Sequence, residues 1–433
     1  MRWAIVGGGM LGMTLALRLT QQGKQVTLLE AAPHLGGLAS AWRLGDVVWD
    51  RHYHVTLASD ANLRAVLREL DLDEEIRWVT TRSGYYVDGQ LYSISDALEL
   101  LRFPALGLLG KLRFGATIFY ASKIRNWQRL EQIPVADWLR RWAGRQAVER
   151  MWLPLLRSKL GETYRDTSAA FIWATIQRLY AARRSGLKTE RFGYVPGGYA
   201  RILERFGALL KQSGVDVRTG AAVASVAGAD GAVEVKLREG AVESYDHAVV
   251  TTAAPLAARI CSGLTEAEAA RLRGIRYLGI VCASALLEQP LSGYYVTNLL
   301  DEGLPFTGVI EMSALVERSQ FGGKALVYLP RYVESNDPFF DVPDDEVRRL
   351  FLDGLRRVYP SVAEADVAVF QISRVRNVMP LPTLGYSQRV PEMDSSVPGL
   401  HLIGSAQIAN GTLNVNETVG LAERAARRFA ELD

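Results

Sequence analysis

A glycine-rich turn near the start of the chain carries the residues best suited to bind a nucleotide. The apolar residues 2–6 lead into Gly7-Gly8-Gly9-Met10-Leu11-Gly12, which has the spacing G-x-G-x-x-G. In such a turn Gly7 lets the strand bend sharply, Gly9 lets a pyrophosphate approach the backbone, and Gly12 lets the next helix pack on the strand. The N-terminus of that helix offers free N–H groups and a positive dipole end to the phosphates.

The residues after this turn complete a dinucleotide-binding unit. Helical periodicity runs from Met13 to Gln22, and Gly23 stands where a C-cap glycine is expected. Residues 25–29 form a second apolar strand, which ends on Glu30, an acid placed to accept hydrogen bonds from a ribose. Because strand, helix, strand and acid occur in this order, we expect a dinucleotide to bind here; a purely structural turn is the alternative.

A second pair of glycines follows the acid and indicates which dinucleotide binds. The chain continues through Ala31 to Gly36-Gly37-Leu38-Ala39-Ser40. This stretch resembles the paired glycines of FAD-dependent amine oxidases, protoporphyrinogen oxidases and phytoene desaturases, where the chain passes close to the pyrophosphate and the flavin. Leu35 and Leu38 replace the arginine that many members carry beside the pair. The resemblance implies, against the alternative of an ordinary Gly-Gly turn, that FAD contacts Ala31, Gly36, Gly37, Leu38 and Ala39.

The composition is that of a packed globular protein with two or three domains. Of the 433 residues, 48% are hydrophobic and 22% are charged, which excludes a disordered chain. The net charge is only +3 and no long basic run with interleaved aromatic residues occurs, so we expect no nucleic-acid partner. Cys261 and Cys282 form neither a disulfide framework nor a metal motif, which favours a reducing cytoplasm.

The sequence shows no segment typical of a signal peptide or a membrane span. The N-terminus enters the first apolar strand without a charged leader, and no run of about 18 apolar residues occurs. The five histidines lack clustered partners, so we expect no metal site. These features predict a cytoplasmic protein. Whether it also associates with the inner face of a membrane depends on the segment between Leu98 and Leu130.

One helical segment combines apolar and basic side chains and has two interpretations. Between Leu98 and Leu130, leucines and aromatic residues alternate irregularly with cations such as Lys111 and Arg113. An interfacial membrane helix shows this composition, and so does a buried helix with snorkelling cations. The segment is therefore expected either to contact a membrane surface peripherally or to be a buried helix.

A histidine-rich stretch supplies the candidate for side-chain chemistry. Residues 47–55 read as a strand that runs into a polar loop. They resemble the family's segment in which a histidine, often after Gly-Pro, lies close to the flavin; His54 is the matching position, although His52-Tyr53 stands where Gly-Pro would be. The alternative is that His52 and His54 project from one face of a strand and only hydrogen-bond the loop.

Two later segments have weaker matches in the same family. Residues 152–161 resemble a segment of protoporphyrinogen-oxidase-like proteins with a mainly structural role; alternatively, Lys159 holds a water near the flavin, as a lysine does in amine oxidases. Residues 374–382 resemble a stretch that lines the flavin face, with Tyr386 as its aromatic residue.

The middle of the chain resembles the return into the FAD domain. Gly197-Gly198 precede an amphipathic helix, as they do at this point in the superfamily. On the strand of residues 221–226, Val223 matches the position whose backbone pairs with adenine in relatives. Residues 233–235 and 246–250 are then expected to complete a small sheet.

The C-terminal segment also resembles a cofactor-binding part of the family. Gly404 ends a strand, and Ser405 replaces the acid that bonds the flavin ribityl or pyrophosphate oxygens in relatives. Asn414 and Val415 open the final helix, whose N-terminus would point at the flavin and stabilise the negative charge that develops on reduction.

These segments together predict an α/β fold in which a Rossmann-like FAD-binding domain is built from three chain segments, with an inserted α+β substrate domain. The expected FAD-binding parts are residues 1–80, 191–255 and 392–433. The expected substrate-domain parts are the helical residues 81–190 and residues 256–391.

The resemblance implies an FAD-dependent oxidase or desaturase that passes hydride from an apolar small molecule to flavin N5, a reaction that needs few acid–base side chains. FAD is expected to bind non-covalently, because neither cysteine lies in a flavin-facing motif. One alternative is a sugar-nucleotide enzyme similar to UDP-galactopyranose mutase, which the stretch Tyr53-His54-Val55 suggests. Another is a flavin-binding protein with a structural or regulatory role.

Overall fold

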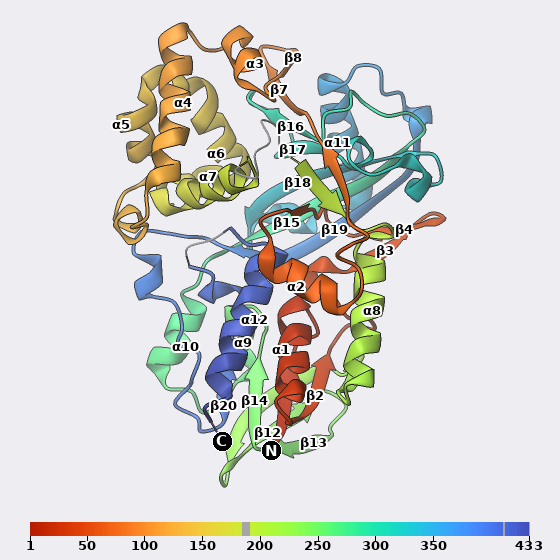
Figure 1. Ribbon diagram of the computed structural model, residues 1–433, viewed down its shortest axis with the longest axis vertical. Coiled ribbons are helices and arrows are strands. Elements are labelled where there is room, and N and C mark those ends of the chain that lie inside the picture. Colours follow the sequence, from red (N-terminus) through yellow and green to blue (C-terminus); the bar gives the residue numbers. More distant parts are fainter. Residues whose placement is uncertain (184–190, 410–411, 433) are drawn as a thin grey trace.

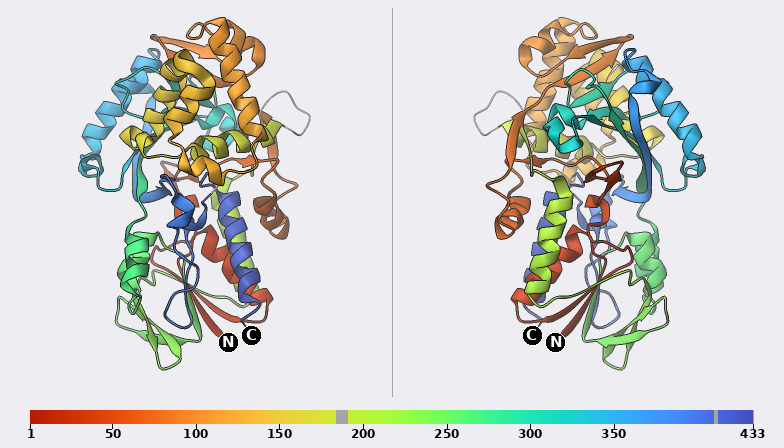
Figure 2. Two further views of the ribbon diagram at one scale, coloured as in Figure 1. Left: turned by 90° about the vertical axis from the view of Figure 1, so that its left-hand side faces the viewer. Right: turned by 90° about the vertical axis from the view of Figure 1, so that its right-hand side faces the viewer.

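The computed structural model describes residues 1–183, 191–409 and 412–432, and it has two lobes (Figure 1). Both chain termini lie at the free end of one lobe, and α3 (Ala97–Arg102) and α4 (Leu108–Lys123) lie at the far end of the other (Figures 1 and 2). We call these the lower and the upper lobe.

Five strands form a parallel sheet in the lower lobe. Their order is β10-β2-β1-β14-β20, and every neighbouring pair runs in parallel. The strands are β1 (Arg2–Val6), β2 (Gln25–Glu30), β10 (Asp216–Thr219), β14 (His247–Val250) and β20 (Leu400–Leu402). Segments from the beginning, middle and end of the chain therefore build one sheet, and the predicted α/β class with a Rossmann-like sheet is confirmed.

Helices cover one face of this sheet and a second, smaller sheet covers the other. The helices are α1 (Met10–Gln21), α8 (Gly198–Gln212) and α12 (Val415–Phe429), which share one hydrophobic core with β1 and β2. On the opposite face lie β11 (Val223–Ala229), β12 (Ala232–Leu237) and β13 (Val242–Tyr245), followed by α9 (Ala254–Ile260) and α10 (Glu266–Arg273).

Two expectations about this lobe need correction. The strand expected at residues 246–250 does not belong to the small sheet, because β14 pairs with β1 and β20. Its buried residues Ala248, Val249 and Val250 fit a central parallel strand, which is covered on both faces. The first helix begins at Met10 rather than Met13, since Gly9 is its N-cap; Gly23, with φ +82°, is confirmed as the terminating glycine.

The upper lobe contains a seven-stranded sheet. Its order is β19-β15-β18-β17-β16-β7-β8. Alternate residues of β15 face opposite ways: Val281 and Ala283 pack towards α11 (Asp344–Val358), whereas Ile280 and Cys282 pack towards the hairpin of β3 (Ala41–Leu44) and β4 (Val47–Asp50). The strands are β7 (Ser83–Val87), β8 (Gln90–Ser93), β15 (Tyr277–Leu287), β16 (Val296–Leu299), β17 (Gly308–Glu311), β18 (Ala325–Glu334) and β19 (Val367–Pro380).

Helices form the far end of the upper lobe and share a separate hydrophobic core. Besides α3 and α4 they are α5 (Val135–Ala147), α6 (Leu153–Leu160) and α7 (Ala169–Arg183). The helix α2 (Ala61–Glu69) packs on the core of the lower lobe. A separate small sheet has the order β5-β9-β6 and consists of β5 (Thr56–Leu57), β6 (Arg77–Thr80) and β9 (Arg191–Tyr194). Among the described residues, no helix has both the length and the apolar character needed to cross a membrane.

The close contact between α1 and β1 predicts that Gly12→Ala destabilises the protein. A Cβ atom built on Gly12 would lie 1.9 Å from the carbonyl oxygen of Gly7, so the helix has to move away from the strand. We expect the free energy of unfolding to fall by about 3 kcal/mol or more in urea denaturation.

Gly115→Ala is the matched control. Gly115 also lies inside a helix, but no atom lies within 4 Å of a Cβ built there. This variant should be neutral or more stable by up to about 1 kcal/mol. Equal stability of the two variants would contradict the proposed contact.

Candidate functional site

The first glycine motif places the N-terminus of α1 at the end of β1. Gly7 has φ +119°, a conformation that favours glycine, and it makes the turn between strand and helix. No side chain caps α1 at Gly9, and its first turn contains no acidic residue. A Cβ atom on Gly9 would meet no atom closer than 3.9 Å, so packing within the protein does not explain this glycine. The uncapped N-terminus and the open space beside Gly9 suit an anionic ligand.

The carboxylate of Glu30 lies beside this turn. It accepts the backbone N–H of Gly8 at 2.6 Å and that of Ala32 at 2.8 Å, one with each oxygen. Each carboxylate oxygen has a further acceptor site, so Glu30 can still accept hydroxyl groups from a ribose. The loop before Val223 also reaches this point, because Ala221 N–H donates to the Glu30 carbonyl at 2.9 Å. The chain thus passes Glu30 two residues before Val223, whose proposed contact with adenine stays a prediction.

The second glycine pair lies directly against the first motif. Gly36 N–H donates to the Gly8 carbonyl at 2.8 Å, and a Cβ atom on Gly37 would lie 3.1 Å from the Cα atom of Gly9. Leu38 and Ala39 follow in a short 3-10 turn. The two stretches that the resemblance assigns to FAD therefore form one continuous surface.

The C-terminal motif joins this surface at the end of β20. A Cβ atom on Gly404 would lie 2.7 Å from the carbonyl oxygen of Thr252, which follows β14. Ser405 begins a 3-10 turn and lies close to the Tyr277 hydroxyl. Asn414 caps α12, since its side-chain oxygen accepts the N–H of Glu417 at 3.0 Å. One of the N–H groups expected to be free at this helix N-terminus is therefore engaged.

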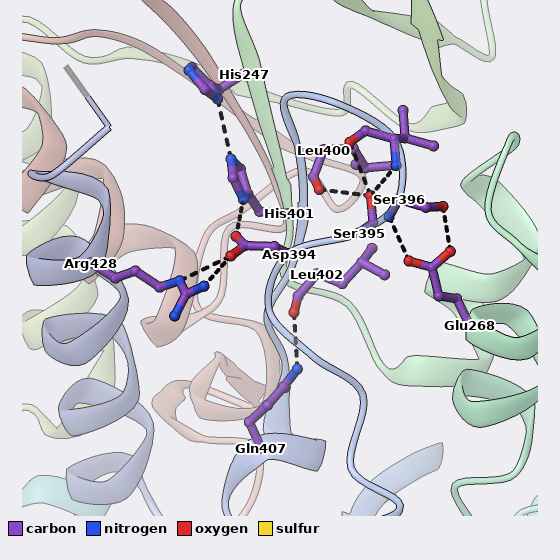
Figure 3. Close-up of polar contacts among 11 residues, drawn as sticks. His247, Glu268, Asp394, Ser395, Ser396, Leu400, His401, Leu402, Gln407 and Arg428 are labelled. Carbon is purple, nitrogen blue, oxygen red and sulfur yellow. Dashed lines mark hydrogen bonds and ion pairs between the residues drawn. The ribbon is translucent and has the colours of Figure 1, made fainter.

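A polar network holds the segment around β20 in place (Figure 3). Gln407 accepts the N–H of Gly404 at 2.8 Å and donates to the Leu402 carbonyl at 2.9 Å. His401 Nδ1 lies 2.9 Å from Asp394, which also accepts hydrogen bonds from Arg428 of α12. The network fixes the strand end that presents Gly404 and ties it to α12.

Two buried hydroxyl groups beside these motifs have no hydrogen-bond partner within the described part of the chain. They are Ser40 Oγ, three residues after Gly37, and Thr252 Oγ1, next to Gly404. A buried hydroxyl without a partner is costly, so such groups usually have a ligand or a water. The phosphate, ribityl and ring acceptors of FAD would supply partners here, and the residues present therefore fit this cofactor.

The two histidines of the loop after β4 have different environments. His52 Nδ1 lies 3.4 Å from the Leu38 carbonyl and Nε2 lies 3.1 Å from Ser373 Oγ, so His52 serves as a structural bridge. His54 Nδ1 is buried without a hydrogen-bond partner among the described residues. Burial lowers the pKa of His52 to about 3 and that of His54 to about 4, which keeps both rings neutral at neutral pH.

Sequence reasoning missed an acidic and an aromatic residue around His54. Asp50 Oδ2 lies 3.9 Å from His54 Nδ1, and the ring of Tyr199 packs on the imidazole with 4.9 Å between centroids. Burial raises the pKa of Asp50 to about 7 and raises that of Tyr199 as well. In the sequence, only two local features could have pointed to these residues: Asp50 lies at the end of a strand, and Tyr199 follows two glycines.

An ion pair that crosses between the lobes was also missed. Arg178 of α7 donates to Asp60 Oδ2 at 3.1 Å, and Asp60 also accepts the N–H of Leu57 at 2.9 Å. Asn416 of α12 accepts the N–H of Asn62 at 2.9 Å and so holds the start of α2 nearby. Nothing in the sequence around Arg178 marks it as a partner of Asp60.

Lys159 and Tyr386 have partners within the protein. Lys159 Nζ lies 3.3 Å from the ring centroid of Tyr332, whose hydroxyl lies 2.9 Å from that of Tyr53. The Tyr386 hydroxyl donates to the Ala406 carbonyl at 2.9 Å, close to Ser405. Lys159 is thus connected to the loop that carries His54 through two phenol rings.

Comparison with known proteins adds independent information. A family model described as flavin containing amine oxidoreductase matches residues 11–429. Carotenoid phi-ring synthase from Streptomyces griseus is 27% identical over 240 residues, which are 50% of this chain and 45% of that protein. Zeta-carotene desaturase from Zea mays is 26% identical over 207 residues, which are 42% of this chain and 35% of that protein. The chain thus spans less than half the length of these curated relatives.

The fold has a counterpart among solved structures. A crystal structure of a candidate protoporphyrinogen oxidase from Exiguobacterium sp. 255-15 covers 100% of this chain and 99% of its own, with a TM-score of 0.78 at 20% identity. The comparisons favour the oxidase and desaturase interpretation over the sugar-nucleotide alternative. Because the family model covers nearly the whole chain and the residues of the site fit FAD, this protein belongs to the flavin-containing amine oxidoreductases, a family of FAD-dependent oxidoreductases.

Proposed function

We propose that this protein is an FAD-dependent oxidase or desaturase that removes hydride from a lipophilic substrate. The observation that carries the proposal is the surface formed by the two glycine motifs, Glu30 and the unpaired hydroxyls of Ser40 and Thr252. When bound, FAD supplies the chemistry by accepting hydride at flavin N5. The cofactor-binding residues we propose are Gly7, Gly9, Met10, Leu11, Gly12, Glu30, Ala31, Gly36, Gly37, Leu38, Ala39, Val223, Gly404, Ser405, Asn414 and Val415.

The protein's own side chains would orient the substrate and exclude water. Tyr53, Tyr295 and Tyr328 lie in the core between β15, β18 and the β3–β4 hairpin, and burial raises the pKa of each hydroxyl. These phenols therefore stay neutral and give a weakly polar wall beside His54. The carotenoid enzymes among the relatives agree with an apolar substrate.

We also propose that the upper lobe touches a membrane surface, from which a lipophilic substrate would enter. The leucines of α4 are unusually exposed: Leu108 and Leu109 each at 67% and Leu112 at 60%. Lys123 Nζ lies 5.1 Å from the ring centroid of Phe119, itself an exposed side chain. Exposed apolar residues beside cations suit an anionic lipid surface, which favours the interfacial interpretation of this segment.

The test of the redox function is the anaerobic visible spectrum of the FAD-loaded protein. We expect flavin bleaching after addition of a polyene or another component of a host lipid extract, and none with putrescine or UDP-sugars. Bleaching by the amine alone would contradict a lipophilic substrate. Absence of bleaching by every reductant, including dithionite, would contradict an enzyme of this class.

The position of Glu30 predicts that Glu30→Gln weakens FAD binding by about ten- to a hundredfold. The amide keeps one oxygen for the backbone N–H groups but has lost the charge and an acceptor for the ribose, which costs about 1.5–3 kcal/mol. The dissociation constant would be measured from flavin fluorescence with the apoprotein. Glu69→Gln is the control, because Glu69 makes its ion pair with Arg18 on the surface; equal losses in both variants would contradict a role for Glu30 at the ribose.

The exposed leucines predict that replacing Leu108 and Leu109 by aspartate lowers binding to anionic phospholipid vesicles at least about tenfold. Each leucine that enters the interface contributes up to about 1.5–3 kcal/mol, and the added negative charge is repelled. Vesicle co-sedimentation measures the effect. Leu350→Asp on α11 is the control, since Leu350 is also exposed but lies on a different part of the lobe. Unchanged binding in the double variant would exclude this surface as the contact.

A further inference from the structure

A carboxyl group is buried where the β3–β4 hairpin meets the N-terminus of α8. Asp50 is only 2% exposed and ends β4. Its Oδ1 accepts the N–H of Tyr199 at 2.7 Å, and a Cβ atom on Gly198 would lie 2.7 Å from the same oxygen. The Asp50 carbonyl accepts the hydroxyl of Tyr328 at 2.5 Å. The N-terminus of α8 thus fixes one oxygen of the carboxyl group, and Tyr328 of β18 fixes the backbone of Asp50.

The other oxygen of this carboxyl group faces an imidazole that has no hydrogen bond on its nearer nitrogen. His54 Nδ1 lies 3.9 Å from Asp50 Oδ2 and has no hydrogen-bond partner among the described residues. The ring of Tyr199 packs on the same imidazole, and its buried hydroxyl also has no hydrogen-bond partner in the described part of the chain. A buried group that the folded protein leaves unpaired is unusual, and it often marks a place where protons or ligands bind.

Among the described residues, no arginine or lysine side chain forms an ion pair with Asp50. The groups that face the pair are the phenols of Tyr199, Tyr295 and Tyr328, together with the neutral ring of His52. The guanidinium of Arg178 is engaged by Asp60 at 3.1 Å. Because burial raises the pKa of these phenols well above neutral, Asp50 and His54 are the groups of this cluster that can exchange a proton near neutral pH.

The pair lies next to the segment that we assign to the flavin. Across the β3–β4 hairpin, Asp50 pairs with Ala41, which directly follows Ser40. Arg51 N–H donates to the Ser40 carbonyl at 2.9 Å. His52, two residues before His54, bonds the Leu38 carbonyl. Backbone contacts therefore hold the pair beside residues 38–40.

We propose that His54 accepts the proton that the substrate releases on oxidation, and that Asp50 is the positioning residue that stabilises the resulting imidazolium. This inference rests on the proposed function. Forming a C=C bond breaks two C–H bonds: one hydrogen leaves with both electrons as hydride to FAD, and the other leaves as a proton to the imidazole of His54. The electron pair of the second C–H bond becomes the new π bond, so atoms and charge balance.

The electrostatics of the site agree with this assignment. Burial raises the pKa of Asp50 to about 7 and lowers that of His54 to about 4, so near neutral pH the imidazole is neutral and the carboxyl group is the one that titrates. Negative charge that develops nearby favours protonation of both groups. Asp50 and His54 would therefore take up a proton when reduction makes the site more negative.

The direct test is the number of protons taken up when the FAD-loaded protein is reduced photochemically at about pH 7, followed with a pH indicator. We expect Asp50→Asn and His54→Gln each to take up fewer protons than the wild type, by up to about one per flavin. Asp73→Asn is the matched control, because Asp73 is equally buried but paired with Arg64 away from this site. Equal proton uptake in all four proteins would overturn the proposal.

A measurement on the protein without cofactor checks Asp50 separately. The folded state binds the Asp50 proton more tightly than the unfolded chain, so the wild type should lose stability relative to Asp50→Asn as the pH rises from about 4 through about 7. A stability difference that does not vary with pH would assign Asp50 a purely structural role. If Asp50→Asn does not fold, His54→Gln provides the proton-uptake comparison alone.

The last measurement is the steady-state turnover of a substrate that has been identified by flavin bleaching. We expect kcat to fall about a hundredfold or more in His54→Gln, with KM little changed, because proton transfer and not binding is affected. Photochemical reduction needs no substrate, so a failed search for a lipophilic substrate would contradict the proposed function without deciding the proton-uptake result.

Discussion

The site depends on one backbone contact, that of Gly12 in α1 with the carbonyl of Gly7 at the end of β1. Only a residue without a side chain permits this approach, and the approach sets where α1 begins. The uncapped helix N-terminus then lies at the carboxyl edge of the sheet, where the other strands also end. Glu30 follows from β2, Ala221 from β10, Thr252 from β14 and Gly404 from β20. Residues that are hundreds of positions apart therefore meet at the same edge.

Features with a local cause could be predicted from the sequence. The order of strand, glycine turn, helix, strand and Glu30 is specified within thirty residues, and it appears in the structure with the helix starting three residues earlier. Gly23 ends α1 because a left-handed residue is needed there, and Asn414 begins α12 because its side chain caps the helix. Such positions carry their physical reason in their immediate neighbours.

Features that depend on a distant partner could not be predicted in this way. The composition of residues 247–250 suits a strand of either sheet, and only the pairing with β1 shows that this strand belongs to the parallel sheet. Tyr199 donates to Asp50 across 149 positions, and Arg178 donates to Asp60 across 118. The two histidines look alike in sequence, yet His52 has Leu38 and Ser373 as partners, whereas His54 Nδ1 has none within residues 1–183, 191–409 and 412–432. The roles of these residues follow from tertiary contacts alone.

Several of the buried groups without a hydrogen-bond partner among the described residues lie in or beside residues 38–54. Ser40 Oγ lies towards the glycine motifs, and His54 Nδ1 and Tyr199 OH lie in the cluster around Asp50. Each such group lowers the stability of the protein without ligand, because its hydrogen bonds to water are lost on folding. A cofactor that satisfies some of these groups stabilises the folded state by mass action. The same burial that leaves these groups unpaired keeps the His54 imidazole neutral, so the proposed protonation of His54 requires the nearby Asp50 carboxylate to stabilise the imidazolium.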